Sequence, residues 1–235
     1  MTQLPTPTAA LAGVPAGLQS QGVWLGRRQL FVRFAAEAET ATMYTADALA
    51  GEIRRATSRT SFHSVSISGR DPLSNVDYLC IAFERAAQAL SGLPVMLDID
   101  GQRPAELDAL KSFAKLAQIT IDGSAPETIV DRAFETVGRA AKLGMQHALV
   151  VLADERTTDA SMLRFAERAH EASDGTMVVI HPGTGIAVDK DRRWTTLFER
   201  ASALHRDVRF LLRLPPPTGM RCGRQVTGTA FSKSC

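Results

Sequence analysis

The chain has 235 residues, of which 45% are apolar and 22% charged, a composition typical of a globular protein with one sizeable core. Lys and Arg number 27 and Asp and Glu 25, so the net charge of +2 provides no overall field that would attract nucleic acid or an anionic membrane. The longest strongly apolar runs, residues 147–152 and 177–180, have the length of strands and are far too short to span a bilayer.

The first residues lack the basic start and continuous apolar region of a signal peptide, so a cytoplasmic location is expected. The cysteines are Cys80, Cys222 and Cys235, and no two of them form a CxxC pair. Apolar neighbours of Cys80 favour a small buried thiol over a reactive one. There is also no HxxxH or HExxH pair and no glycine-rich phosphate loop, so neither zinc nor a nucleotide held in the usual cradle is expected.

From residue 28 onward, short β-branched and apolar runs alternate with stretches of helical periodicity. The predicted strands are Gln29–Ala35, His63–Ser68, Val95–Asp98, Gln118–Asp122, His147–Ala153, Met177–His181 and Val208–Leu214. The predicted helices are Ala46–Ser58, Val76–Leu90, Ala105–Leu116, Glu127–Leu143, Thr158–Ala172 and Arg193–His205. This alternation indicates an α/β fold with right-handed crossovers and a parallel sheet. Periodicity leaves open whether the sheet is doubly wound or forms a full or partial barrel.

In either architecture, ligands bind where the carboxyl ends of the strands meet the following loops. That rule nominates the loops 36–45, 69–74, 99–103, 123–126, 154–158 and 182–189.

Three segments, taken in order, resemble the radical S-adenosylmethionine (SAM) enzymes that make 7-carboxy-7-deazaguanine. Residues 19–35 (QSQGVWLGRRQLFVRFA) are similar to the family's QGEGxxxGxxxxFVRxAG, residues 62–73 (FHSVSISGRDPL) to its strand leading into TGGEPL, and residues 93–104 (LPVMLDIDGQRP) to its LPVxLETNGxxP. The resemblance extends weakly to about Arg213. It implies a partial parallel (β/α)6-type barrel over residues 18–214, between a flexible N-terminal extension (1–17) and a flexible C-terminal tail (215–235).

The family's CxxxCxxC motif, which holds an iron–sulfur cluster, would fall on residues 37, 41 and 44 in this register. These positions are Glu37, Ala41 and Tyr44. A carboxylate, a methyl group and a phenol do not replace three soft thiolates. No cluster is therefore expected, and without it the chain lacks the electron source for reductive cleavage of SAM.

Other positions that touch SAM or substrate in the family also differ. GGEP becomes Gly69-Arg70-Asp71-Pro72, ETNG becomes Asp98-Ile99-Asp100-Gly101, and QGEG becomes Gln19-Ser20-Gln21-Gly22. Arg33, which resembles the arginine that meets the substrate's carboxylate, is retained. SAM binding stays open, but not in the family's pose, because an arginine replaces a glycine that permits close approach.

The ligand-binding candidates are Gln19, Gln21, Gly22, Arg33, Gly69, Arg70, Asp71, Asp98, Asp100 and His181. Their carboxylates could serve a hard metal or a ligand cation, or they could be solvated partners of Arg33 and Arg70. His181 could lie on a pocket rim or cap a turn. Tyr44 could stack on a purine or fill the space that a cluster vacates.

Two classes of function follow. The first is a ligand-binding or partner-binding pseudoenzyme, acting alone, as a homodimer or beside an active paralogue. The second is an enzyme, either a lyase of 7-deazaguanine (queuosine-type) biosynthesis or one that uses the barrel for non-radical chemistry. The family's residues are lost at the cluster, SAM and substrate positions together, and this combination favours the pseudoenzyme.

Overall fold

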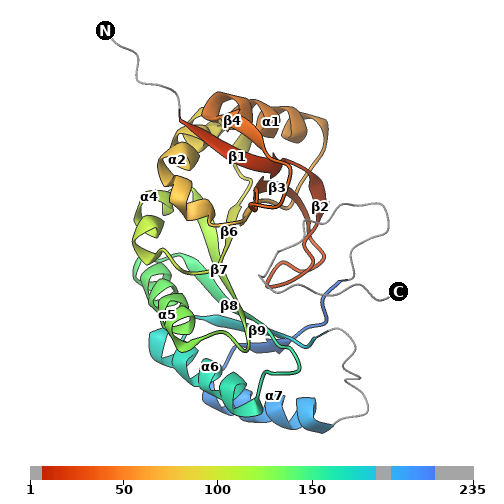
Figure 1. Ribbon diagram of the computed structural model, residues 1–235, viewed down its shortest axis with the longest axis vertical. Helices are drawn as coiled ribbons and strands as arrows, with labels where there is room; N and C mark the ends of the chain where they lie inside the picture. Colours follow the sequence, from red (N-terminus) through yellow and green to blue (C-terminus); the bar gives the residue numbers. More distant parts are fainter. Residues whose placement is uncertain (1–6, 184–191, 215–235) are drawn as a thin grey trace.

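The computed structural model describes residues 7–183 and 192–214, which form a curved, open sheet with helices along one side (Figure 1). The parallel strands are β3 (Arg28–Phe34), β5 (Ser64–Gly69), β6 (Val95–Ile99), β7 (Ala114–Asp122), β8 (Gln146–Leu152), β9 (Met177–His181) and β10 (Val208–Phe210). Each pairs with the next parallel strand along the chain.

The helices are α1 (Ala46–Arg59), α2 (Val76–Arg85), α3 (Ala87–Leu90), α4 (Leu107–Leu110), α5 (Glu127–Lys142), α6 (Asp159–Ala172) and α7 (Arg192–Leu204). The main helices follow the convex side of the sheet (Figure 1). A strand order without reversal, with helices on one side, is that of a barrel and not of a doubly wound sheet. The sheet ends at β4 and β10, which do not pair with each other, so the barrel is partial. The predicted α/β class with a parallel sheet is confirmed.

Three strands at the N-terminal end of the sheet were not expected. Strands β1 (Thr8–Gly13) and β2 (Ala16–Leu18) lie antiparallel to β3, and β4 (Thr42–Thr45) lies antiparallel to β1. The prediction of a flexible extension over residues 1–17 is therefore wrong for the part that the structure describes. The β1 sequence, TAALAG, has a single β-branched residue, Thr8, and no aromatic residue, so it gives only a weak strand signal. Pairing with β3 and burial of Ala9 and Leu11 stabilise it instead.

The predicted helix Ala105–Leu116 is also largely wrong. Pro104 begins a short 3₁₀ turn, α4 occupies one turn after it, and residues 114–116 already belong to β7. Leu116 pairs with Met96 of β6, so contacts between distant strands override the local helical pattern. Strand β10 is shorter than predicted, and the predicted tail 215–235 lies outside the described residues.

The two faces of the sheet differ in chemistry because side chains alternate along each strand. Residues such as Val32, Ile67 and Leu97 face the helices and form the main core. The opposite, concave face carries many polar residues that are buried: Gln29, Ser64, Ser66, Asp98, Gln118 and His181. The inside of this half-barrel is therefore built largely from groups that require hydrogen bonds.

A loop formed by residues 19–27, called the plug loop below, covers part of this concave face. Hydrogen bonds from Gln19 N to Arg27 O (2.9 Å) and from Gly26 N to Gln19 O (2.8 Å) close its base. Val23 and Trp24 of the loop pack against Met96 and neighbouring apolar residues of the inner face. Within the described ranges, no helix is long and apolar enough to cross a membrane.

Candidate functional site

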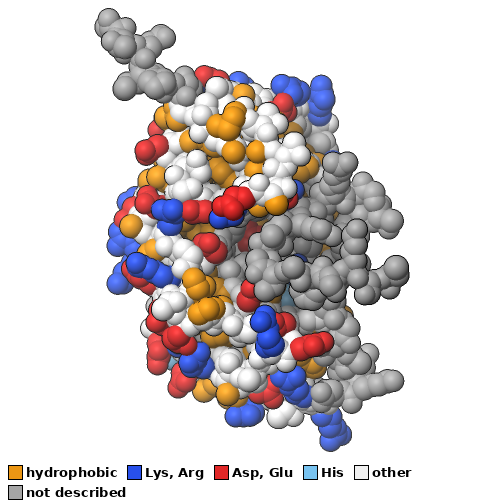
Figure 2. All heavy atoms as spheres, viewed as in Figure 1, with side chains coloured by type: hydrophobic (Ala, Val, Ile, Leu, Met, Phe, Trp, Pro, Cys, Tyr) orange, Lys and Arg blue, Asp and Glu red, His pale blue; other side chains and the backbone are white. Residues whose placement is uncertain are grey.

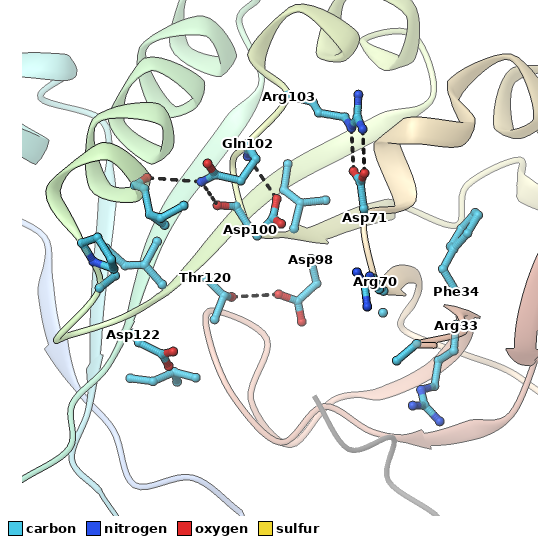
Figure 3. A pocket seen from close by; sticks show the side chains of 18 of the residues that line it. Arg33, Phe34, Arg70, Asp71, Asp98, Asp100, Gln102, Arg103, Thr120 and Asp122 are labelled. Atoms are coloured by element: carbon cyan, nitrogen blue, oxygen red, sulfur yellow. Dashed lines mark hydrogen bonds and ion pairs between the residues drawn. The ribbon is translucent and has the colours of Figure 1, made fainter. Parts of the chain in front are cut away.

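A polar cavity of about 1100 Å³ opens at the carboxyl ends of the parallel strands (Figure 3). Its lining includes Arg33, Gly69, Arg70, Asp71, Asp98 and Asp100 of the predicted candidates, together with residues of the loops 99–103 and 124–126. Side chains of both signs lie close together across the middle of this face of the molecule (Figure 2). The structure thus brings the loops after β3, β5, β6 and β7 to one site, as the strand order predicts.

The backbone after β5 is shaped for close approach to β3. Gly69 has a φ of 100°, and a Cβ added there would lie 2.1 Å from the backbone oxygen of Phe34. Asp71 has a φ of 40°, the left-handed conformation that non-glycine residues seldom adopt. Its carboxylate accepts two hydrogen bonds of 2.7 Å from the guanidinium of Arg103. This bidentate pair joins the loop after β5 to the loop after β6 (Figure 3).

The arginines around the cavity are ion-paired. Besides Arg103 with Asp71, the pairs are Arg33 with Glu39 (3.0 Å), Arg70 with Glu37 (2.8 Å) and Arg156 with Asp154 (3.0 Å). The Arg33–Glu39 pair is the least exposed, with 15% and 25% of the two side chains accessible. Glu39 also accepts a hydrogen bond from Ala36 N, which fixes the turn after β3.

Asp98 is the most deeply buried charged candidate, with 6% of the residue exposed. Its Oδ1 accepts a 2.9 Å hydrogen bond from the Thr120 hydroxyl (Figure 3). Its Oδ2 accepts a weak hydrogen bond of 3.4 Å from Gln19 Nε2. Burial raises the pKa of Asp98, and these hydrogen bonds together with the Gln118 side chain oppose the rise. Within the described residues, no arginine, lysine or histidine forms an ion pair with it. Asp100 instead accepts from Gln102 N and shapes the following turn.

His181 holds the plug loop in place. Its Nε2 accepts a 2.7 Å hydrogen bond from Gly22 N, and its Nδ1 donates to the backbone oxygen of Leu211 at 2.6 Å. Burial lowers the pKa of His181 to about 4, so the ring is neutral at physiological pH. Both ring nitrogens are thus used inside the protein. This arrangement favours the structural interpretation of His181, and Gly22 contributes to the same contact.

The plug loop is also held by Gln118, whose Oε1 accepts from Val23 N at 3.0 Å. A Cβ on Gly22, where φ is 77°, would lie 1.9 Å from that oxygen, so the loop requires glycine there. Gln21 is buried with the loop, with 3% of the residue exposed. Gln19 reaches the cavity wall through its hydrogen bond to Asp98.

The former cluster positions do not fit an iron–sulfur cluster. Glu37 is 83% exposed and pairs with Arg70, Ala41 is exposed, and Tyr44 is in β4 opposite Ala9 and packs against the core. None of the three supplies sulfur. Cys80 is the cysteine within the described part of the chain, where burial raises the pKa of its thiol and its Sγ faces Ala109 O. In those same ranges no three His, Cys, Asp or Glu side chains are arranged to bind a metal ion.

Three further cavity residues, Glu39, Arg103 and Arg156, lie in loops that the sequence nominated but were not singled out as candidates, whereas Thr120 and Asp122 were missed altogether. For Thr120 and Asp122, the sequence contained a signal that could have identified them. Thr120 and Asp122 alternate with Ile119 and Ile121 at the end of a predicted strand, a pattern that puts them on one face. Glu39 and Arg156 are in loops, which have no periodic pattern from which the direction of a side chain could be predicted. Of the nominated loop 182–189, residues 184–189 lie outside the described residues.

Fold and site together define an open, partial (β/α) barrel with a polar cavity at the carboxyl ends of its strands. The chain matches no protein-family model. Among curated proteins it is similar to the 7-carboxy-7-deazaguanine synthase of Methanothermobacter thermautotrophicus, with 23% identity over 197 residues that cover 71% of this chain and 77% of the relative. This level of identity supports a distant relationship.

Among solved structures, the fold is similar to two 3-dehydroquinate dehydratases. The type I 3-dehydroquinate dehydratase of Clostridium difficile is 10% identical with a TM-score of 0.41, covering 70% of this chain and 68% of its own. The 3-dehydroquinate dehydratase of Enterococcus faecalis is 13% identical with a TM-score of 0.43, covering 77% of each chain. Both TM-scores are below 0.5, so neither likeness supports an argument about this protein.

Proposed function

We propose that this chain is a radical-SAM-like protein, distantly related to 7-carboxy-7-deazaguanine synthase, that binds a small polar molecule in the cavity and holds no iron–sulfur cluster. The observation that carries the proposal is the contrast between two neighbouring parts of the site. In the loop after β3, Glu39 and Glu37 form ion pairs with Arg33 and Arg70 where the family would hold its cluster, whereas the adjoining cavity of about 1100 Å³ is open and polar.

The Glu37–Arg70 pair supports loss of the radical chemistry. Glu37 replaces the first cysteine of the family pattern, and Arg70 replaces a glycine of the GGEP segment. The two departures meet in a 2.8 Å ion pair. The pair puts two charged side chains where the family carries a thiolate and a glycine, which supports the absence of a cluster in this proposal.

Asp98 supports retention of a binding site. A buried carboxyl group without an ion-pair partner is costly, and it persists where a ligand or a function requires it. In the predicted register, Asp98 replaces the glutamate of ETNG, so an acidic side chain is kept at this position. Thr120 and Gln19 orient the carboxyl group from two different parts of the chain.

Two measurements test the proposal. Anaerobic reconstitution with iron and sulfide should leave the protein without stoichiometric iron or visible cluster absorbance. A thermal-shift panel should contain SAM, S-adenosylhomocysteine, 5′-deoxyadenosine, 7-carboxy-7-deazaguanine and MgCl₂. A compound present at about 100 times its Kd should raise Tm by roughly 5–10 °C.

The matched variants are Asp98→Asn and Asp131→Asn, the second removing an exposed carboxylate on α5. The shift should vanish in Asp98→Asn and persist in Asp131→Asn. Stoichiometric cluster assembly would refute the pseudoenzyme part of the proposal. A shift that survives Asp98→Asn would refute the assignment of the binding site.

A non-radical enzyme is the second candidate, and the raised pKa of Asp98 favours it. A cavity carboxyl group that holds its proton more tightly than usual is suited to general acid–base catalysis. Mass spectrometry of the compound that binds, before and after incubation with wild type and Asp98→Asn, separates turnover from binding. A homodimer, an active paralogue as partner and a cytoplasmic location stay predictions.

A further inference from the structure

Two bidentate pairs of an aspartate with an arginine allow a direct comparison within this chain. Arg103 donates from Nε and Nη2 to the carboxylate of Asp71, each at 2.7 Å. Arg139 contacts the carboxylate of Asp108 through the same two nitrogens. The side chains are 42% and 36% exposed in the first pair and 43% and 42% exposed in the second. The two pairs thus have similar chemistry and similar access to solvent.

The two pairs differ in their place in the fold. Asp71 and Arg103 both line the polar cavity, where they join the loop after β5 to the loop after β6 (Figure 3). Asp108 is in α4 and Arg139 in α5, and neither is a residue of the cavity lining. A small molecule in the cavity therefore meets the Arg103 pair and not the Arg139 pair.

The pairs also differ in the backbone of the aspartate. Asp71 has a φ of 40° and a ψ of 56°, and it is the one non-glycine residue with a positive φ in the part of the chain that the structure describes. This left-handed conformation is unfavourable for a residue with a side chain, and Pro72 further favours an extended backbone at the residue before it. Asp108 lies within a helix and has no positive φ. Strain is therefore confined to the pair in the cavity.

Contacts at both ends of Asp71 hold it in this conformation. Its backbone oxygen accepts hydrogen bonds from Ser74 N at 3.1 Å and from the Ser74 hydroxyl at 2.7 Å, while its carboxylate is held by Arg103. The residue before it is fixed to β3, because Arg70 N donates to Phe34 O. Release of the carboxylate would let Asp71 relax toward an extended conformation. The strain thus offsets part of the stabilisation that the Arg103 contact provides, and it weakens Asp71 as a partner of Arg103.

We infer that the Asp71–Arg103 pair is an exchangeable latch, in which a carboxylate or phosphate group of the cavity ligand replaces Asp71 on the guanidinium of Arg103. Either group matches the planar fork of an arginine, as the aspartate does. Asp71 then relaxes, and the loop after β5 is released from the loop after β6. The inference rests on the proposed function in that a small molecule binds in the cavity. It restricts that molecule to one that carries a carboxylate or a phosphate.

Titration of the full chain with inorganic phosphate, and separately with acetate, tests the exchange. Chloride keeps the ionic strength constant, and the Nε–Hε NMR signals of Arg103 and Arg139 report the anion that each guanidinium contacts. One or both salts should shift the Arg103 signal at a concentration lower by about fivefold or more than the concentration that shifts the Arg139 signal, because only Asp71 is strained. The salt with the lower apparent Kd at Arg103 distinguishes a phosphate ligand from a carboxylate ligand. Equal responses of the two arginines would overturn the inference.

Removal of the competing carboxylate provides the matched variants. Asp71→Asn should lower the apparent Kd of the preferred anion at Arg103 by about threefold or more, since the internal competitor is gone. Asp108→Asn, which makes the same change in the pair outside the cavity, should leave the titration of Arg103 as it is in wild type. An apparent Kd that does not respond to Asp71→Asn would count against the latch.

Hydrogen exchange at Ser74 measures the release of the loop, because its N–H is bonded to Asp71 O. Arg103→Gln should accelerate this exchange by about fivefold or more, whereas Arg139→Gln should not change it. Adding Asp71→Gly to Arg103→Gln should restore the protection, since glycine adopts the left-handed conformation without strain. If Arg103→Gln has no effect at Ser74, or if Asp71→Gly does not restore the protection, strain does not drive the release and the inference fails.

These measurements use simple salts and no candidate ligand, so their outcome is independent of the thermal-shift panel. A latch that responds as described, without any stabilising compound in the panel, would retain the latch and remove the proposed function. A compound that stabilises wild type through Asp98 without shifting the Arg103 signal would retain the proposed function and remove the latch.

Discussion

The guanidinium of Arg70 lies 2.8 Å from the carboxylate of Glu37, and this contact joins the loop after β5 to the loop after β3. The two side chains are 56% and 83% exposed. Exposed pairs of this kind contribute little to stability, because water screens the charges and two flexible side chains lose freedom. The pair is therefore expected to contribute little to the stability of the fold.

A double-mutant cycle measures the strength of that contact. Glu37→Gln, Arg70→Gln and the double variant should each differ from wild type by less than about 1 kcal/mol in the free energy of unfolding. Urea denaturation at low and at high salt gives the coupling energy. A coupling above about 2 kcal/mol would show that the loop depends on the pair.

The less exposed Arg33–Glu39 pair should behave differently. Arg33→Met should lower the free energy of unfolding by about 1–3 kcal/mol, because Glu39 then keeps a half-buried charge without its partner. Arg33→Met with Glu39→Gln should recover part of that loss. If the double variant is no more stable than the single one, the pair is not what holds Arg33 in place.

Asp98 predicts a pH dependence. Since its folded pKa is raised above the ordinary 3.8, ionisation becomes harder on folding, and the stability of wild type falls as the pH rises through the folded pKa. Asp98→Asn removes this pH-dependent loss of stability. Between pH 4 and pH 8, the free energy of unfolding of the variant should therefore rise relative to that of wild type. Each unit of pKa shift corresponds to about 1.4 kcal/mol. Urea titrations of both proteins across this range, with Asp131→Asn as the surface control, measure the gain.

His181 predicts an effect of opposite sign. The unfolded imidazole takes up a proton near pH 6.5 but the folded one only near pH 4, so the unfolded state binds more protons in between. Stability should therefore fall as the pH is lowered from about 7 to 4, by up to about 3 kcal/mol. Protonation of Nε2 removes the acceptor for Gly22 N, so amide exchange in the plug loop should accelerate first. His181→Gln, which offers both an acceptor and a donor without titrating, should show a flatter profile.

Two glycines with similar backbone conformations test the close approach of β3 and β5. Gly69→Ala should destabilise the protein by more than about 3 kcal/mol, because the new Cβ meets the backbone of Phe34. Gly92 also has a positive φ, of 75°, but no atom lies within 4 Å of its Cβ position. Gly92→Ala should therefore cost only about 1 kcal/mol. Comparable losses at the two sites would contradict the packing described for Gly69.

Much of the architecture could be predicted from the sequence because it rests on local patterns. Strands β3 and β5 to β9 are short runs of β-branched and apolar residues, and most helices have a clear apolar stripe. Alternation of the two implies a parallel sheet, and the carboxyl-end rule then brings Arg33, Asp71 and Asp98 to one cavity. Absence of the three cysteines at positions 37, 41 and 44 is likewise a property of the sequence alone.

Only the tertiary structure decided the partners of these residues. Each of these contacts joins two segments that are distant in sequence and are brought together by the sheet, so no local pattern predicts it. The contacts are Glu37–Arg70, Asp71–Arg103 and His181–Gly22. Strand β1 and the start of β7 were not predicted from the sequence for a related reason. Long-range pairing, and not the intrinsic propensity of their residues, stabilises them. The polar character of the concave face also emerged only once the strands were in register, when alternate residues of separate strands formed one surface.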